Sequence, residues 1–240
     1  MPSGRRQPDR SPRAVHLGDR QGPCRQLDRA SPHAPLPRSW PFHGRRRRSR
    51  SIKGLPGAES VTLDSYQQRV VAETSRLRLR ELAYSDHAEL AKVLADREVM
   101  HFSMRGPLTN DQTSAFIEAN HSLYRERQFG MWAVEQSADG ALIGFCGLSP
   151  IDLAGKEEIE LGYRLTPSAW GKGLATEAAC ATVKQGINNC CLDSIIAIVA
   201  SSHPASASVA RKAGMSLETT TRFHAWEVDI FRYRRHDDKD

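Results

Sequence analysis

The chain has 240 residues, enough for one domain with a long tail, and its formal net charge is +6. This charge is uneven: residues 1–53 hold 14 basic and 3 acidic residues, whereas the rest holds 20 basic and 25 acidic residues. The folded part is therefore expected to be acidic, which argues against nucleic-acid binding by that part. No apolar run reaches about 18 residues, so we expect no membrane-spanning helix and no membrane partner.

Residues 1–71 are predicted to form a disordered tail and linker. They are rich in Arg, Pro and Ser, and they cannot bury enough apolar surface to offset their chain entropy. The basic run at 45–50 would attract nucleic acid; the alternatives are a solvated tail or an over-extended start. Residues 236–240 are predicted to be a charged C-terminal tail. No secretory signal is recognisable, so the cytoplasm is the expected location.

Residues 72–235 are predicted to be one domain of alternating strands and helices. Period-two alternation predicts a first strand at 77–82, and Asp86 is placed to cap a helix that runs to about residue 94. A second helix is expected from about residue 110. The later predicted elements are strands at 130–135, 142–148 and 157–165, a helix at 174–185, a strand at 193–200, a helix at 204–213 and a strand at 227–234.

Two glycines, Gly171 and Gly173, stand one residue apart between the strand at 157–165 and the helix at 174–185. Glycine lets a backbone approach a phosphate, and the first amides of a helix point toward such an anion. The spacing lacks the third glycine of a dinucleotide fingerprint and the closing residues of a P-loop. By itself, this spacing leaves an ordinary tight turn as an equal alternative to an anion site.

Three segments together resemble the GNAT N-acetyltransferases, in particular the branch with the ribosomal-protein N-terminal (alanine/serine) acetyltransferases. They are TPSAWGKGLATEA at 166–178, PASASVARKAGM at 204–215 and TSRLRLR at 74–80. Gly173 and Ala175 occupy the last two fixed places of the family's Arg/Gln-x-x-Gly-x-Gly/Ala pattern, and Trp170 occupies the first. His203 stands where the branch carries Asn. The resemblance covers about residues 72–235.

The resemblance implies an α/β (α+β) fold with a mixed, mostly antiparallel twisted sheet and helices on both faces. It also implies a splay after the fourth strand, at 157–165, which admits the pantetheine arm of acetyl-CoA. The implied co-substrate-binding residues are Leu165, Thr166, Trp170, Gly171, Lys172, Gly173, Leu174, Ala175, Thr176 and His203. The cysteines and histidines show no metal-ligand spacing, so no metal is expected.

Acetyl transfer to an amine needs a group that takes the amine proton and a donor for the leaving thiolate. Glu160 is the candidate base, ahead of Glu158, and the alternative is a solvent-facing or salt-bridged carboxylate. Ser206 stands where the branch carries a serine near the thiol; a simple first-turn residue of a helix is an equal alternative. The candidate acceptor-pocket residues are Phe102, Trp132 and Arg222, and a core position is the favoured alternative for Trp132.

We therefore expect an enzyme that moves an acetyl group from acetyl-CoA to a primary amine by direct attack in a ternary complex. The acceptor is expected to be a protein N-terminus, as on a ribosomal protein, or a small molecule. One alternative is a non-catalytic CoA-binding regulator on the same fold. The other is a nucleic-acid-associated protein that acts through its Arg-rich tail. A monomer and a homodimer both fit the sequence.

Overall fold

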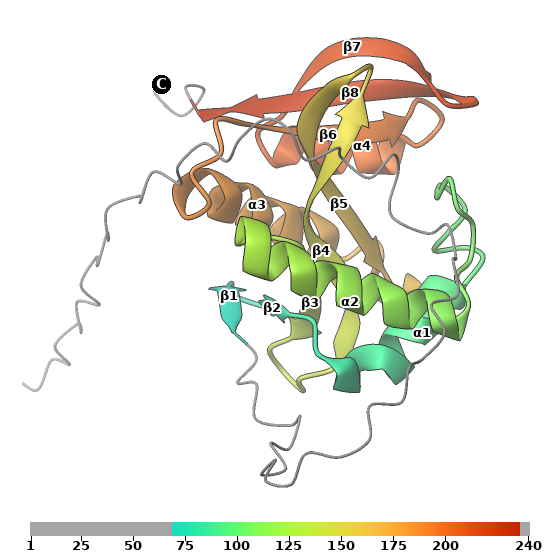
Figure 1. Cartoon of the computed structure of the whole chain (residues 1–240), viewed down its shortest axis with the longest axis vertical. Coiled ribbons are helices and arrows are strands. Elements are labelled where there is room, and N and C mark those ends of the chain that lie inside the picture. The colour runs from blue at the N-terminus through green and yellow to red at the C-terminus, as the bar shows by residue number, and fades with distance from the viewer. Residues whose placement is uncertain (1–68, 236–240) are drawn as a thin grey trace, which may run out of the picture. The chain divides into compact units, whose positions relative to one another are not determined.

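The computed structural model describes residues 69–235, and the two predicted tails lie almost entirely outside the described residues (Figure 1). In chain order the elements are β1 Val70–Glu73, β2 Leu77–Glu81, η1 Tyr84–Asp86, α1 His87–Ala95, α2 Asn110–Arg127, β3 Met131–Gln136, β4 Leu142–Leu153, β5 Lys156–Leu165, η2 Pro167–Ala169, α3 Leu174–Asn188, β6 Ser194–Ala200, α4 Pro204–Lys212, β7 Ser216–Phe223 and β8 Trp226–Arg234.

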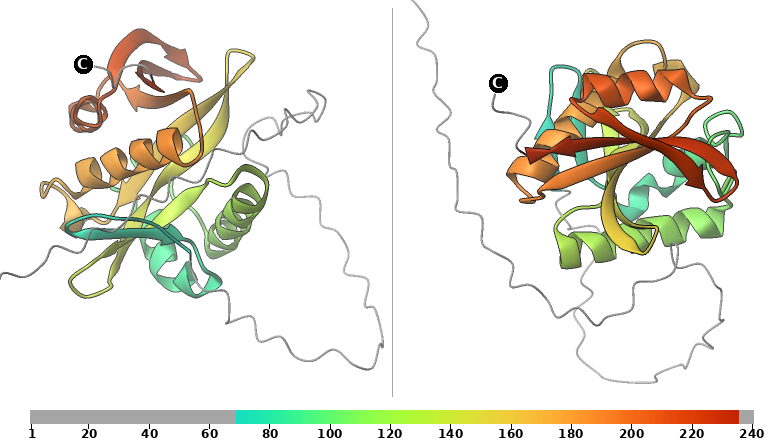
Figure 2. Two further views of the ribbon diagram at one scale, coloured as in Figure 1. Left: turned by 90° about the vertical axis from the view of Figure 1, so that its left-hand side faces the viewer. Right: turned by 90° about the horizontal axis from the view of Figure 1, so that it is seen from above.

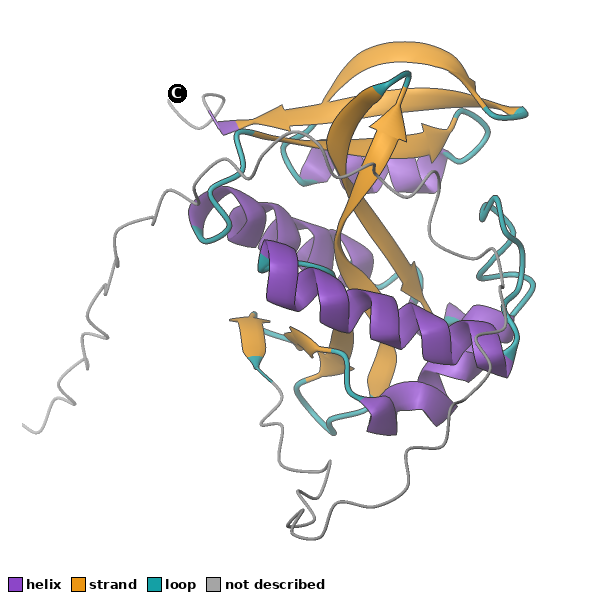
Figure 3. Cartoon of the chain, viewed as in Figure 1, coloured by secondary structure: helices purple, strands orange, loops and turns teal. Residues whose placement is uncertain are grey.

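All eight described strands form one sheet in the order β1-β2-β3-β4-β5-β6-β8-β7. Every neighbouring pair is antiparallel except β5 and β6, which are parallel. Helices α2 and α3 lie on opposite sides of the strands (Figures 2 and 3). The predicted mixed, mostly antiparallel sheet with helices on both faces is confirmed.

Two of the strands, β1 and β7, were not predicted from the sequence. Strand β7 is exposed along nearly its whole length, so it has no apolar alternation to reveal it. Strand β1 has only four residues and pairs with β2 at the edge of the sheet. Because β1 precedes the first predicted strand, the fourth predicted strand is β5.

The predicted cap of α1 takes a different role in the structure. Asp86 occupies the N-cap position, but its side chain makes no capping hydrogen bond. Its carboxylate instead accepts two hydrogen bonds from Arg80 at 2.7 and 2.8 Å, and Arg80 also contacts Glu135. Since Arg80 and Asp86 are both buried, this ion pair fixes α1 against β2.

The two faces of β5 meet different parts of the core, as its alternation predicts. Leu161 and Leu165 belong to the cluster that includes residues of α3 and α4. A Cβ on Gly162 would lie 3.0 Å from Cε of Met131, which belongs to the cluster on the α1 and α2 side. By the two-residue period of a strand, Glu160 and Arg164 share the face of Gly162.

Strands β5 and β6 are in register at one pair only, Glu160 with Ile196, whereas β4 and β5 stay paired along the whole of β5. The sheet therefore splays after β5, as the resemblance implied. On the N-terminal side of Glu160 the two halves are joined by an ion pair, in which Arg232 Nη1 of β8 lies 2.8 Å from Glu158 Oε2. No described helix is long and apolar enough to cross a membrane.

Candidate active site

The turn before α3 has the backbone geometry of an anion site. Gly171 and Gly173 have φ values of +70° and +76°, a left-handed conformation that favours glycine. A Cβ at Gly171 would meet no atom within 4 Å, so the turn has an open side. Gly173 is the N-cap of α3 and supplies no side-chain cap, so no side-chain cap competes with a ligand for the first helical amides. A turn of this geometry can accept an anionic group.

A network from the turn between β1 and β2 fixes the start of α3. The Glu177 carboxylate accepts hydrogen bonds from Thr74 Oγ1 at 2.6 Å and from the Arg76 backbone amide at 3.0 Å. The Arg76 side chain also binds Glu177 and donates to the carbonyl of Lys172 at 2.9 Å. Burial would raise the pKa of Glu177, but these hydrogen bonds outweigh it and lower that pKa.

Sequence reasoning missed this network, although the segment 74–80 was one of the three that carried the resemblance. Beside it lies a hollow of about 440 Å³, and its lining includes Arg76, Lys172 and Leu174. Lys172 thus places a positive charge at the glycine turn, where an anion would be favoured, whereas the charge of Arg76 is compensated by Glu177.

Trp170 joins the glycine turn to the end of β5. Its indole Nε1 donates to the carbonyl of Leu165 at 2.8 Å, while its side chain remains partly exposed. The Thr166 amide donates to Ile143 at 2.8 Å and the Thr166 carbonyl accepts from Ala169, so both its backbone groups are used inside the protein. The expectation that Thr166 offers them to pantetheine is therefore not supported.

Leu165 keeps one backbone group for a ligand. Because the next residue, Thr166, bonds toward β4, ladder alternation directs the Leu165 amide away from β4 and into the gap beside β5. An extended pantetheine arm can accept a hydrogen bond there in the manner of an added strand.

Glu160 lies at the point where β5 and β6 part. No described residue hydrogen-bonds its carboxylate, and Arg164 is the charge that acts on it. Burial raises the pKa of Glu160 to about 7, with Arg164 opposing that shift. A carboxylate with a pKa near neutrality is suited to accept a proton at physiological pH.

Glu158 is the salt-bridged carboxylate of this strand. It contacts Arg232 and Lys156, and the hydrogen bond from Arg232 lowers its pKa despite burial. The alternative of a structural carboxylate therefore applies to Glu158, and Glu160 is the better candidate for the base.

Ser206 lies in the first turn of α4, and its Oγ is 3.0 Å from the hydroxyl oxygen of Tyr163 on β5. The N-cap of α4 is His203, which makes no side-chain cap, so Ser206 is a first-turn residue whose hydroxyl faces a tyrosine. Sequence reasoning did not single out Tyr163, since alternation along the strand placed it only on the face opposite Glu160.

An aromatic cluster forms around His203, the N-cap residue of α4. The rings of Phe102 and His203 are stacked, with centroids 4.0 Å apart and planes 11° apart, and Trp226 lies edge-on to Phe102 at 6.1 Å. Burial lowers the pKa of His203, and the charges of Arg164 and His101 lower it further. A stacked, neutral His203 thus borders the place where we expected the acceptor.

The other two predicted pocket residues differ in their surroundings. Trp132 is 1% exposed and lies in the core cluster on the α3 side, so the prediction that it lines the acceptor pocket is wrong. The apolar run of β3 already favoured that core position. Arg222 is exposed on β7, next to the turn where Phe223 pairs with Trp226.

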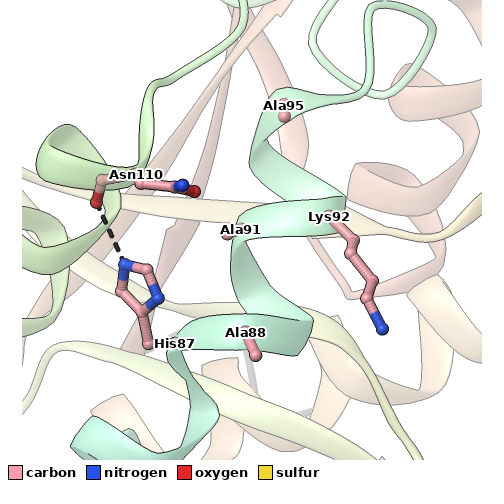
Figure 4. A pocket seen from close by; sticks show the side chains of 6 residues that line it. All are labelled: His87, Ala88, Ala91, Lys92, Ala95 and Asn110. Carbon is pink, nitrogen blue, oxygen red and sulfur yellow. Dashed lines mark hydrogen bonds between the residues drawn. The ribbon is translucent and has the colours of Figure 1, made fainter.

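A second hollow, of about 450 Å³, contains none of the predicted site residues (Figure 4). It lies along α1, where His87 Nε2 is 3.0 Å from the carbonyl of Asn110 and the rest of the lining is mainly alanine. Nothing in this lining matches the chemistry of acetyl transfer.

Comparison with known proteins places this geometry in a family. Residues 76–216 match the acetyltransferase (GNAT) domain family. The chain belongs to the GNAT acetyltransferases. It is therefore an acyltransferase enzyme, and enzymes of this family use acetyl-CoA as co-substrate, as the resemblance implied.

Individual relatives agree with this assignment. The uncharacterized protein YkkB of Bacillus subtilis (strain 168) is 31% identical over 163 residues, which are 68% of this chain and 93% of that protein. The uncharacterized N-acetyltransferase YoaA of the same organism is 27% identical over 159 residues, which are 65% of this chain and 89% of that protein.

Two solved structures share the fold at low sequence identity. The ribosomal L7/L12 alpha-N-protein acetyltransferase RimL, in complex with CoA, has a TM-score of 0.61 and 18% identity, and the match covers 71% of this chain and 100% of RimL. The spermidine N-acetyltransferase of Vibrio cholerae, in complex with CoA and spermine, has a TM-score of 0.57 and 19% identity, covering 68% and 98%.

Proposed function

We propose that this GNAT enzyme transfers the acetyl group of acetyl-CoA to a primary amine in a ternary complex, with Glu160 as the base. The observation that carries the proposal is the partly buried Glu160 carboxylate at the splay of the sheet, which no described residue hydrogen-bonds and whose pKa is about 7. Acetyl-CoA supplies an activated thioester. Acetyl-CoA is proposed to be held by the turn from Gly171 to Thr176, by the Leu165 amide and by His203.

The reaction needs two proton movements. The amine nitrogen attacks the acetyl carbon, and its proton passes to Glu160 directly or through one water. The carbon–sulfur bond then breaks, the Ser206 hydroxyl hydrogen-bonds to the leaving sulfur, and the thiolate takes a proton from solvent. Holding both substrates beside β5 supplies much of the rate by proximity.

The acceptor is proposed to approach along the aromatic cluster of Phe102, His203 and Trp226, with Arg222 at its edge. Aromatic faces attract ammonium groups; the amine then reacts as its free base, after loss of a proton to solvent, and Glu160 takes the proton released during attack. Both a protein N-terminus and a small amine satisfy these requirements. We further propose that residues 72–235 form the acetyltransferase domain, that the enzyme works in the cytoplasm, and that the N-terminal tail takes no part in the chemistry.

Thiol release from acetyl-CoA with a panel of amines tests this function. The full chain is assayed with peptides bearing free N-termini and with polyamines, and CoA binding is measured by calorimetry in parallel. Thiol release with at least one amine, lost in Glu160→Gln, is expected. Binding without turnover on any amine would instead favour the non-catalytic regulator. Retention of nucleic acid that disappears when residues 1–53 are deleted would favour the tail-mediated alternative.

A further inference from the structure

The hydroxyl groups of Tyr163 and Ser206 meet across the splay of the sheet. Tyr163 lies on β5, three residues beyond the Glu160–Ile196 register pair, while Ser206 lies on α4, which follows β6. Their oxygens are 3.0 Å apart, so this hydrogen bond joins the two diverging halves of the sheet.

We propose that Tyr163 is a positioning residue that acts through Ser206. Its phenol donates to Ser206 Oγ, which leaves the serine hydrogen free to bond to the leaving sulfur. This inference rests on the proposed acetyl transfer and assigns a role in it to a residue that the family motifs did not indicate.

Either hydroxyl could be the donor in this hydrogen bond, and the surroundings of Tyr163 favour donation by its phenol. Among the described residues, Ser206 is the hydrogen-bond partner of the Tyr163 hydroxyl. Burial raises the pKa of Tyr163, so the phenol keeps its hydrogen throughout the pH range of an enzyme assay. The Tyr163 hydroxyl is partly buried, and Ser206 Oγ is the acceptor within its reach among the described residues.

Donation by Tyr163 has two consequences for Ser206. The serine hydrogen is excluded from the Tyr163 side and turns toward the gap where the thioester sulfur is proposed to lie. A serine that accepts a hydrogen bond also becomes a stronger donor, because chained hydrogen bonds polarise one another. Tyr163 loses no proton in this scheme, in keeping with its raised pKa.

Strand β5 places the proposed base and this positioning residue on its two faces. Glu160 lies on the α1 and α2 side, whereas Tyr163 packs against the cluster that contains α3 residues. Because both residues lie on one rigid strand, β5 can fix the distance between Glu160, which receives the amine proton, and Tyr163, which orients the Ser206 hydroxyl toward the sulfur.

A double-mutant cycle on the full chain distinguishes the positioning role of Tyr163 from that of a hydrogen bond that only stabilises the structure. The variants are Tyr163→Phe, Ser206→Ala and the pair together, with Tyr84→Phe as a matched control because Tyr84 is exposed and bonds to Glu118. We expect Tyr163→Phe to lower kcat about tenfold, the cost of one lost hydrogen bond in the transition state. Calorimetric affinity for CoA should stay within about twofold.

In the Ser206→Ala background, Tyr163→Phe should cause no further loss of kcat, since the partner through which it acts is gone. If Tyr163→Phe lowers kcat by the same factor in both backgrounds, the proposal is overturned. A loss of CoA affinity that matches the loss of kcat would also overturn it. Either result would leave the proposed acetyl transfer unaffected. An inactive wild type with every amine would overturn both proposals together.

Discussion

Glu158 and Glu160 lie two residues apart on one face of β5, and their pKa values move in opposite directions. The hydrogen bond from Arg232 lowers the pKa of Glu158, whereas burial without a hydrogen-bonding partner raises that of Glu160 to about 7. The two neighbouring carboxylates therefore have different roles: Glu158 joins the halves of the sheet, and Glu160 is proposed to accept a proton.

The pH profile of activity reports on Glu160. A base must be ionised, so kcat/KM of the wild type should rise with pH and level off above about 7, near the pKa of Glu160. Glu160→Gln should lower kcat/KM about 100-fold and remove this rise. Glu157→Gln, which alters an exposed carboxylate on the same strand, should keep the wild-type profile. A wild-type profile in Glu160→Gln would contradict the assignment.

Glu158→Gln should destabilise the fold. Arg232 and Glu158 are both less than 10% exposed, so removal of one partner leaves a buried charge poorly compensated, although Glu218 still contacts Arg232. We expect a loss of about 3 kcal/mol in the free energy of unfolding, measured with denaturant at pH 7.

The pH dependence of this loss has a defined sign. Because pairing lowers the pKa of Glu158 below its ordinary 4.5, the stabilisation is present above about pH 4.5 and disappears as the pH falls through the lowered value. Wild type and variant should therefore converge in acid. The exposed pair of Arg127 and Glu157 supplies the control, since Glu157→Gln should change stability by less than about 1 kcal/mol.

Gly173→Glu should abolish CoA binding. The substitution puts bulk and negative charge beside the first amides of α3, where the pyrophosphate is proposed to bind. Gly140→Glu is the matched control: its φ is +71°, close to the +76° of Gly173, and it lies in the open turn between β3 and β4. Calorimetry should show binding for the control alone, and equal binding by both would refute the anion site.

Phe102→Ala should weaken acceptor binding more than it weakens CoA binding, to which Phe102 is linked only through its stacking on His203. Phe102 stacks on His203 and contacts Trp226, on the side of the gap proposed for the amine. A lost aromatic face should raise the acceptor KM about fivefold or more, in line with a stacking contribution of about 1 kcal/mol. An unchanged acceptor KM, or a loss of CoA affinity that matches the rise in KM, would contradict the assignment of Phe102 to the acceptor site.

Trp132→Ala distinguishes a core residue from a pocket residue. With 1% exposure in the core, its removal should cost about 3–5 kcal/mol of stability. Thermal unfolding should show a large drop in melting temperature, with the acceptor KM of the surviving folded fraction unchanged. A stable variant with an altered acceptor KM would instead support the prediction that Trp132 lines the acceptor pocket.

Local pattern was sufficient for most of the fold. The alternation of β2, the apolar faces of the helices and the glycines of the turn are signals contained within a few residues, and each predicted element is present. The failures were β1 and β7, where a short edge strand and an exposed strand carry no such signal. Asp86 occupies the predicted N-cap position, but its side chain is used by a buried ion pair that local pattern did not reveal.

The sequence by itself determined the family, the order of the predicted elements and the position of the glycine turn, because glycine conformation and hydrophobic period are properties of neighbouring residues. The tertiary structure alone decided which carboxylate is free and which hydroxyls meet. Arg232 follows Glu158 by 74 residues, and Ser206 follows Tyr163 by 43. Pairing, burial and pKa at these positions depend on atoms brought together by the sheet and its splay, and no local pattern encodes that proximity.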